Sequence, residues 1–443
     1  MTFPNDFAWG VATSSYQIEG SVGEGRGECI WHRFSHTPGK TLNGEHGDVA
    51  CDHLHLYRDD VALMRDLGIK HYRFSTSWPR VLPNGTGAVN PRGMDFYDSL
   101  VDTLLEADIT PYLTLYHWDL PQALQDKGGW ENPDSVRWFT DYARLMVERL
   151  GDRVPYWITH NEPWCASFLS NELGIHAPGK RDLSAALKVA HHLLRSHGMA
   201  TRAIRDQKPT VKVGIAINMN GITPVSSDPR DVLAASYHDG YANRWFLDPL
   251  FHGRYPADMV ELFGAALDGI ELGAVEVAAV PLDFMGLNYY QREYFGWDDA
   301  SPIKVRNVRG QQVKRTAMGW EVHPQSLTDI LVRLKRDYAI PAIYITENGA
   351  AYDDPEPVNG LVDDPERVDY YAGHIRAVEE AIAQGVPVRG YFAWSFMDNF
   401  EWAEGYSKRF GIVHVDFETQ VRTPKSSALY YRDTIAVQHR QRR

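Results

Sequence analysis

The sequence predicts a (β/α)₈ barrel (TIM barrel), and three observations favour this fold class. Short β-type runs alternate with helical stretches along all 443 residues, which is typical of a parallel sheet with helical crossovers. About eight such runs can be recognised, the number that closes a barrel. Polar and aromatic residues recur where these runs end, as barrel active sites require. No linker-like stretch divides the chain, so we expect one domain over residues 1–443, with extended βα loops around the active site.

Each predicted strand is a short run of aliphatic, aromatic and β-branched residues. These runs cover residues 7–13, 72–77, 111–117, 156–162, 213–218, 284–290, 343–347 and 390–395. The stretches between them predict helices at residues 57–67, 93–107, 136–150, 185–203, 327–337 and 367–384.

A doubly wound open sheet is the alternative fold. It requires a glycine-rich phosphate turn, G-x-G-x-x-G, directly after its first strand. Residues 20–27 are rich in glycine but do not fit this pattern, and no GK[ST] follows them. We therefore expect a long βα loop at this position.

Charge and cysteine content narrow the classes of partner and compartment. The net charge is −13 and the pI is about 5.8, which argues against nucleic acid or an anionic membrane as a partner. Cys29, Cys51 and Cys165 are too few and odd in number for a disulfide framework, and fit a reducing compartment. No secretory signal or long apolar run is recognisable. We expect a cytoplasmic protein with no membrane partner.

Two short carboxylate motifs are the most informative feature of the chain. Glu162 stands in T-H-N-E-P and Glu347 in I-T-E-N-G, each directly after a β-type run. A lone glutamate at a strand end is more often a structural ion-pair partner. Two such glutamates facing each other suit cleavage of a glycosidic bond, which needs a carboxylic acid and a carboxylate. The chain as a whole is 12% aromatic, and such a surplus of rings suits a sugar pocket, where sugar C–H faces pack on them.

Several further motifs carry a resemblance that covers essentially the whole chain. They are F-A-W-G-V-A-T at 7–13, Q-I-E-G at 17–20, H-W-D-L-P at 117–121, W-S at 394–395 and N-F-E-W at 399–402. With these motifs the chain resembles family 1 glycoside hydrolases, the β-glucosidase family. The resemblance implies a retaining enzyme in which Glu162 is the acid/base and Glu347 the nucleophile. It implies small-molecule β-glycoside substrates and neither a metal nor an organic cofactor.

The resemblance also assigns the remaining pocket residues. It implies that terminal β-D-glucosyl residues are released from cellobiose, short cello-oligosaccharides and aryl or alkyl β-glucosides, with some β-galactosidase and β-fucosidase activity. The residues that it places around the sugar are Gln17, His117, Trp118, Asn161, Asn288, Tyr290, Trp320, Trp394, Glu401, Trp402 and Phe410. Physical chemistry adds that Glu347 must be ionised to attack, so it needs hydrogen-bond donors and positive charge nearby. Arg73 and the Tyr290 hydroxyl are the candidates for this role.

Two alternative functions stay open on the sequence. Relatives that cleave 6-phospho-β-glycosides have Ser at the position of Glu401 and Tyr at the position of Phe410, so this specificity is disfavoured. A non-catalytic sugar-binding barrel would lack one of the two motif glutamates, and here both are present. The oligomeric state is not predicted.

Four features depart from the family pattern or admit a second interpretation. His160 is expected to point away from Glu162 and to pack in the core. Cys165 is interpreted as a small buried hydrophobe. The loop at residues 168–178 differs from the common version, which leaves the leaving-group preference open. The histidines His53, His55, His191, His192 and His197 lack the spacing of a metal site.

Overall fold

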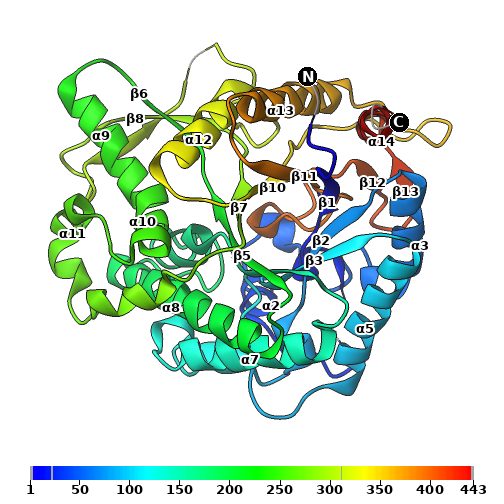
Figure 1. The fold of residues 1–443 in the computed structure, drawn as a ribbon, viewed down its shortest axis with the longest axis horizontal. Helices are drawn as coiled ribbons and strands as arrows, with labels where there is room; N and C mark the ends of the chain where they lie inside the picture. Colours follow the sequence, from blue (N-terminus) through cyan, green and yellow to red (C-terminus); the bar gives the residue numbers. More distant parts are fainter. Residues whose placement is uncertain (1–2, 21–22, 311, 441–443) are drawn as a thin grey trace.

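The computed structural model describes residues 3–20, 23–310 and 312–440, and these form the predicted barrel (Figure 1). Its parallel strands follow the order β1-β2-β3-β4-β5-β7-β10-β11, and β11 pairs back with β1. They are β1 Ala8–Ala12, β2 His71–Ser75, β3 Thr110–Tyr116, β4 Tyr156–Asn161, β5 Lys212–Asn218, β7 Phe284–Asn288, β10 Ile343–Asn348 and β11 Val388–Trp394. Gly10 of β1 aligns with His71 on one side and Phe392 on the other, which closes the cylinder.

The closed sheet confirms the predicted fold class, and the open-sheet alternative is wrong. All eight predicted strands are present, with ends that shift by a few residues. Of the glycine-rich segment 20–27, residues 21 and 22 lie outside the described residues.

A cluster of aromatic rings fills one end of the barrel. Tyr112 stacks on Tyr156 with ring centroids 4.1 Å apart and meets the edge of Phe392 at 4.8 Å. Tyr344 and Phe284 complete the cluster, with their ring centroids 5.3 Å apart. All of these rings except Phe392 come from the first halves of their strands, so the cluster seals the N-terminal end and leaves the opposite end for a site.

Helices surround the sheet (Figure 1). The longer ones are α3 His53–Asp66, α5 Pro91–Glu106, α7 Ser135–Leu150, α8 Leu183–Gln207, α9 Pro229–Asp239, α10 Trp245–His252, α11 Ala257–Phe263, α12 Pro324–Asp337, α13 Pro365–Ala383 and α14 Ser426–Arg440. The short ones are α1 Ser15–Ile18, α2 Ile30–Ser35, α4 Trp78–Val81 and α6 Gln122–Gln125. The six predicted helices correspond to α3, α5, α7, α8, α12 and α13. Among the helices of the described ranges, none has the length and apolarity that a bilayer span requires.

The long βα loops contain elements that the sequence analysis did not predict. A three-stranded sheet comprises β6 Gly221–Pro224, β8 Arg292–Trp297 and β9 Val305–Val308, and a hairpin comprises β12 Val413–Val415 and β13 Arg422–Pro424. Because β6 follows β5 and β8 follows β7, this sheet lies beyond the C-terminal ends of the barrel strands. The helices α9, α10 and α11 were also missed.

Candidate active site

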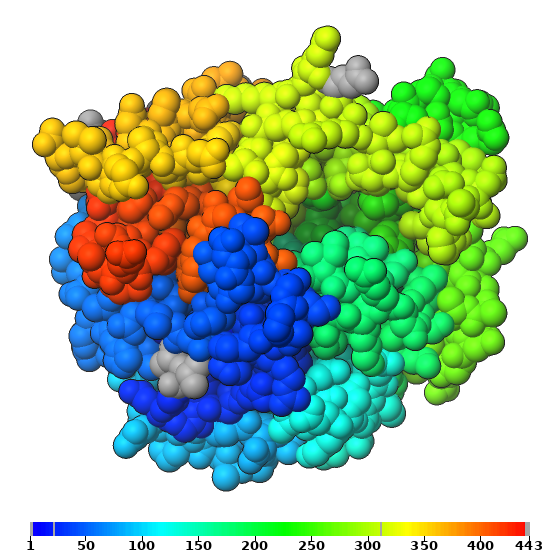
Figure 2. Space-filling model, turned by 180° about the vertical axis from the view of Figure 1, so that it is seen from behind, coloured from blue at the N-terminus to red at the C-terminus, as the bar shows by residue number. Residues whose placement is uncertain are grey.

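A cavity of about 330 Å³ opens at the C-terminal ends of the barrel strands. Figure 2 shows this face hollowed between the teal, yellow-green and orange segments of the chain. Ten of the predicted site residues line the cavity: His117, Trp118, Glu162, Tyr290, Trp320, Glu347, Trp394, Glu401, Trp402 and Phe410. The predicted residues Gln17, Arg73, Asn161 and Asn288 are buried in the layer of side chains behind them.

Glu347 is held by a cation and a hydroxyl. It lies near the end of β10, where Arg73 of β2 donates to its Oε1 at 2.6 Å and the Tyr290 hydroxyl donates to its Oε2 at 2.5 Å. Burial raises the pKa of the Glu347 carboxyl above its usual value, and the charge of Arg73 and the hydrogen bond from Tyr290 limit this rise. Both donors stabilise the carboxylate form, so this side chain is equipped to carry the negative charge of the pair.

Glu162 has a different environment. The Asn288 amide donates to its Oε1 at 2.7 Å, and the Cys165 thiol contacts its Oε2 at 3.0 Å. Burial and the negative charge of Glu347 raise the pKa of Glu162 to about 7. The two carboxyl groups are therefore driven toward opposite protonation states at neutral pH, as acid–base pairs in enzymes are.

Asn161 connects the two carboxyl environments. Its Oδ1 accepts from Arg73 at 2.6 Å and from Asn288 at 3.0 Å. This fixes the amide orientation, so Nδ2 donates to Nε2 of His117 at 3.1 Å. The His117 proton then resides on Nδ1, which has no partner among the described residues. Burial holds the pKa of His117 well below its usual range, so the ring is a neutral donor.

Glu401 lies at another wall of the cavity, beside Gln17. Gln17 accepts from Ser14 at 2.5 Å and directs its amide toward Oε2 of Glu401 at 3.4 Å. Burial, followed by repulsion from Glu347 and Glu162, raises the pKa of Glu401 to about 8. This carboxyl group therefore offers both a donor and an acceptor near neutral pH.

Three aromatic planes lie close to parallel next to these carboxyl groups. The centroid of the His117 ring lies 5.8 Å from that of Trp394, with an interplanar angle of 17°, and 5.9 Å from that of Trp402, with an angle of 18°. Trp320 packs against Tyr290 at 5.3 Å and Phe410 at 5.9 Å. Flat rings next to hydroxyl-binding groups suit a ligand with both C–H faces and hydroxyls.

Backbone strain is concentrated at this cavity. Glu162, Trp118 and Trp402 have φ angles of 47°, 77° and 51°, in the left-handed region that side chains other than glycine rarely adopt. Such conformations cost on the order of 1–3 kcal/mol and persist where surrounding contacts impose them. Here they aim the Glu162 carboxyl and the two indoles into the cavity.

Cys165 differs from its sequence-based interpretation. It is buried, but its thiol lies 3.0 Å from the Glu162 carboxylate and lines the cavity, so it is more than a packing hydrophobe. His160 follows the expectation: it lies next to Ser196 at 2.8 Å and stacks on Phe139 at 4.3 Å, away from Glu162.

Other lining residues were missed because they lie on loops. The segment 168–178 contributes Leu169, Ile175 and His176. The β6–β8–β9 sheet brings Glu293 to the wall, where Asn220 donates to its Oε2 at 2.8 Å. Trp164, which the Asn-Glu-Pro motif places next to the site, also lines the cavity.

Comparison with known proteins identifies the family. The model of glycosyl hydrolase family 1 matches residues 1–440. The chain belongs to glycosyl hydrolase family 1. This family 1 enzyme is 47% identical over 442 residues to β-glucosidase A of Acetivibrio thermocellus, with 98% of each chain covered. It is also 47% identical over 435 residues to the 1,4-β-D-glucan glucohydrolase of Thermotoga neapolitana, with 98% of each covered.

A solved structure extends the similarity to three dimensions. The family 1 glycoside hydrolase of Thermotoga maritima, complexed with a cyclophellitol analogue described as a transition state mimic, superposes with a TM-score of 0.96 at 47% identity. The alignment covers 99% of this chain and 98% of that one. The predicted family and the predicted enzyme class, a β-glucosidase, are thereby confirmed.

Proposed function

We propose that this family 1 enzyme releases terminal non-reducing β-D-glucosyl residues by double displacement through a covalent glycosyl-enzyme. The observation that carries the proposal is the asymmetry of the two carboxyl groups. Glu347 has a cation and a hydroxyl in contact, whereas Glu162 has a pKa of about 7. One group is prepared to attack as a carboxylate and the other to donate a proton.

In the first step, Glu347 attacks the anomeric carbon, and a C–O bond forms to its carboxylate as the glycosidic C–O bond breaks. Glu162 transfers its proton to the departing oxygen, so the aglycone leaves as a neutral alcohol or sugar. The ester at Glu347 no longer carries the negative charge that raises the Glu162 pKa. Glu162 can then take a proton from water, which attacks the same carbon and restores Glu347 with retention.

The sugar itself is held by the groups around the cavity. His117, Asn161, Gln17 and Glu401 supply donors and acceptors for its hydroxyls, and the Trp394 ring supplies a flat face for its C–H groups. Trp118, Trp402 and Phe410 complete the glucosyl pocket, and Trp320 lines the leaving-group side. Asn288 positions the carboxyl group of Glu162, and Tyr290 positions that of Glu347.

The charge of the cavity favours a neutral sugar over a phosphorylated one. The described residues that line the cavity include four glutamates in addition to Glu162 and no lysine or arginine. Arg73 lies outside this lining and is engaged with Glu347 and Asn161. A phosphate would enter without a cationic partner, which disfavours the 6-phospho-β-glycosidase alternative.

The substrate range and cellular setting complete the proposal. Cellobiose, short cello-oligosaccharides and aryl or alkyl β-glucosides are the proposed substrates, with β-galactosides and β-fucosides as slower ones. The name of the Thermotoga neapolitana relative, 1,4-β-D-glucan glucohydrolase, supports the β-1,4-linked glucose substrates among these. Free, buried Cys29, Cys51 and Cys165 support a cytoplasmic location. The family match over residues 1–440 supports a single domain.

Initial rates on p-nitrophenyl β-glucoside and on its 6-phosphate ester test the proposal directly. We expect turnover of the neutral glucoside, and a rate for the phosphate ester at least about 100-fold lower, because an unpaired dianion in this cavity costs several kcal/mol. Glu347→Ala serves as the blank. Preference for the phosphate ester would contradict the pocket assignment. Absence of turnover on both, by folded protein, would favour the non-catalytic alternative.

A further inference from the structure

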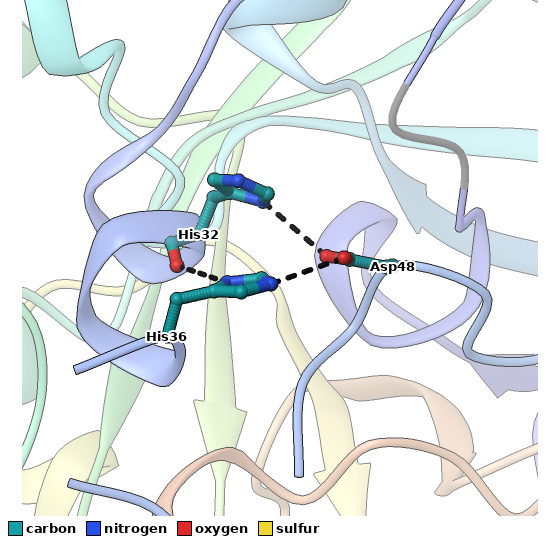
Figure 3. Close-up of side chains that lie close together, drawn as sticks. All are labelled: His32, His36 and Asp48. Carbon is teal, nitrogen blue, oxygen red and sulfur yellow. Dashed lines mark hydrogen bonds and ion pairs between the residues drawn. The ribbon is translucent and has the colours of Figure 1, made fainter. Parts of the chain in front are cut away.

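A cluster of imidazoles around one carboxylate lies outside the cavity, on α2 and the segment that follows it. His32 and His36 lie one helical turn apart, and both rings face Asp48 (Figure 3). Nδ1 of His32 is 3.3 Å from Oδ1 of Asp48, and Nε2 of His36 is 3.1 Å from Oδ2. We propose that His32, His36 and Asp48 bind a divalent transition-metal ion, with Zn²⁺ as the reference ion.

The spacing of these atoms is that of ligands around a metal. Zn²⁺ binds imidazole nitrogen and carboxylate oxygen at about 2.0–2.2 Å in tetrahedral geometry, which places neighbouring ligand atoms roughly 3.3 Å apart. The observed nitrogen–oxygen separations of 3.3 and 3.1 Å match this distance between neighbouring ligand atoms. All three ligand atoms lie within 4.8 Å of one another. Little rearrangement is therefore needed for binding.

The hydrogen bonding of His36 calls for a cation at this position. Its Nδ1 lies 2.7 Å from the carbonyl oxygen of His32, to which it donates, so Nδ1 carries the proton of the neutral ring. Nε2 then directs a lone pair at the Asp48 carboxylate. Two acceptors this close need a positive charge between them, either a proton or a metal. A ring nitrogen bonded to a backbone carbonyl is also the usual way in which a metal-binding histidine is oriented.

A third imidazole, His46, lies next to the same carboxylate and offers a further ligand. The ring of His36 is tilted against that of His32, with centroids 4.3 Å apart, and stacks on that of His46 at 4.5 Å. Nδ1 of His46 lies 3.4 Å from Oδ2 of Asp48. Neutral imidazoles and one carboxylate are a donor set that suits zinc, nickel or copper. His46 or water completes the fourth position.

The cluster is accessible from solvent, because the side chains of His32, His36 and Asp48 are 25%, 38% and 24% exposed. Binding there fastens α2 to the segment that contains residues 45–48. This segment contacts the loop after β11: the backbone N–H of Tyr406 donates to Glu45 at 2.7 Å, and its hydroxyl donates to the carbonyl oxygen of His46 at 2.8 Å. The metal therefore stabilises the segment 45–48, which in turn holds the loop that carries Glu401. Its role is structural.

Isothermal titration of metal-stripped, tag-free protein with ZnCl₂ at pH 7.5 tests the site. We expect one equivalent of zinc to bind the wild type and to raise its thermal midpoint. His36→Ala and Asp48→Asn should each weaken binding at least about tenfold and abolish the thermal shift, because each removes a ligand. Asp48→Asn preserves the side-chain shape, and hydrolysis of an aryl β-glucoside reports that each variant is folded.

His55→Ala is the matched control. His55 is an exposed histidine that lies 2.6 Å from Asp52, so its loss removes a similar surface pair outside the cluster. Zinc binding equal to that of the wild type is expected. Absence of a stoichiometric site in the wild type, or equal binding by the wild type, His36→Ala and Asp48→Asn, would overturn the proposal.

Discussion

At the scale of single residues, the chemistry depends on two identical side chains in unequal surroundings. Arg73 touches Glu347 at 2.6 Å, while Glu162 contacts an amide and a thiol. The proposed roles follow from these contacts, since a cation stabilises a carboxylate and burial with a neighbouring negative charge stabilises the protonated acid. With Glu162 as the acid, kcat/KM should fall as pH rises through about 7.

The influence of Glu347 on Glu162 can be measured with Glu347→Gln. This change removes the negative charge that raises the Glu162 pKa and leaves burial in place. We therefore expect the Glu162 pKa to fall below about 7. Titration of the labelled carboxyl carbon by NMR measures it, with Glu162→Gln/Glu347→Gln to assign the signal. An unchanged pKa would mean that burial alone sets the value.

Cys165 gives a second residue-scale prediction. Its thiol, 3.0 Å from Glu162, stabilises the carboxylate and so lowers the Glu162 pKa. In Cys165→Ala this donor is lost, so the alkaline limb of the kcat/KM profile should move to higher pH. Cys165→Ser is the matched control because its hydroxyl keeps a donor. Identical pH profiles for the alanine and serine variants would show that the thiol has no effect on the acid.

At the scale of elements, the barrel strands were predictable and the loop elements were not. Strands such as β1 and β10 are buried along their whole length, so their apolar runs stand out in the sequence. β6 and β9 have four residues each and stay half-buried or exposed along most of their length, which leaves no strong pattern. The helices α9 and α10 lie in the long connection between β6 and β7. The helix α10 also contains Pro249, a residue type that usually argues against a helix.

The same division applies to the site. Arg73, Glu162 and Glu347 were predictable because a barrel brings strand ends together whatever the loops do. His176 and Glu293 reach the cavity only through loop paths that one sequence does not reveal. His32 and His36 carried a readable i, i+4 spacing, but their third partner, Asp48, is brought to them by tertiary structure.

A buried charge network holds the loop after β11 to the start of α14. Lys425 lies 2.7 Å from Asp398 and also contacts Asp354, and all three side chains are buried. Lys425→Met leaves both aspartates without this partner, so we expect a loss of about 3–5 kcal/mol in the free energy of unfolding. Urea denaturation measures it. Lys335→Met, at an exposed lysine of α12, should change stability by less than about 0.5 kcal/mol. Equal effects of the two changes would contradict the proposed importance of the network.

At the scale of the whole molecule, the two ends of the chain meet on one barrel wall. Figure 1 marks both termini on the same side, and β1 closes the cylinder between β2 and β11. Tyr431 of α14 contacts the junction of β1 and β11, called here the seam, from the outside of the barrel. Its buried hydroxyl lies 2.8 Å from the carbonyl oxygen of Gly10 in β1 and 3.0 Å from that of Tyr391 in β11. The helix α14 thus bridges the first and last strands of the barrel.

Tyr431→Phe removes this bridge while it preserves the ring. Loss of one buried hydrogen bond should reduce the free energy of unfolding by about 1 kcal/mol. Because these two strands are the first and last of the barrel and the hydroxyl contacts both, amide hydrogen exchange should also accelerate in β1 and β11 more than in β4 or β5 on the far wall. Tyr430→Phe, at the half-buried neighbour on α14, is the control and should change neither measurement. Uniform acceleration around the barrel would mean that Tyr431 stabilises the fold generally, whereas selective acceleration at β1 and β11 identifies closure of the seam as its contribution.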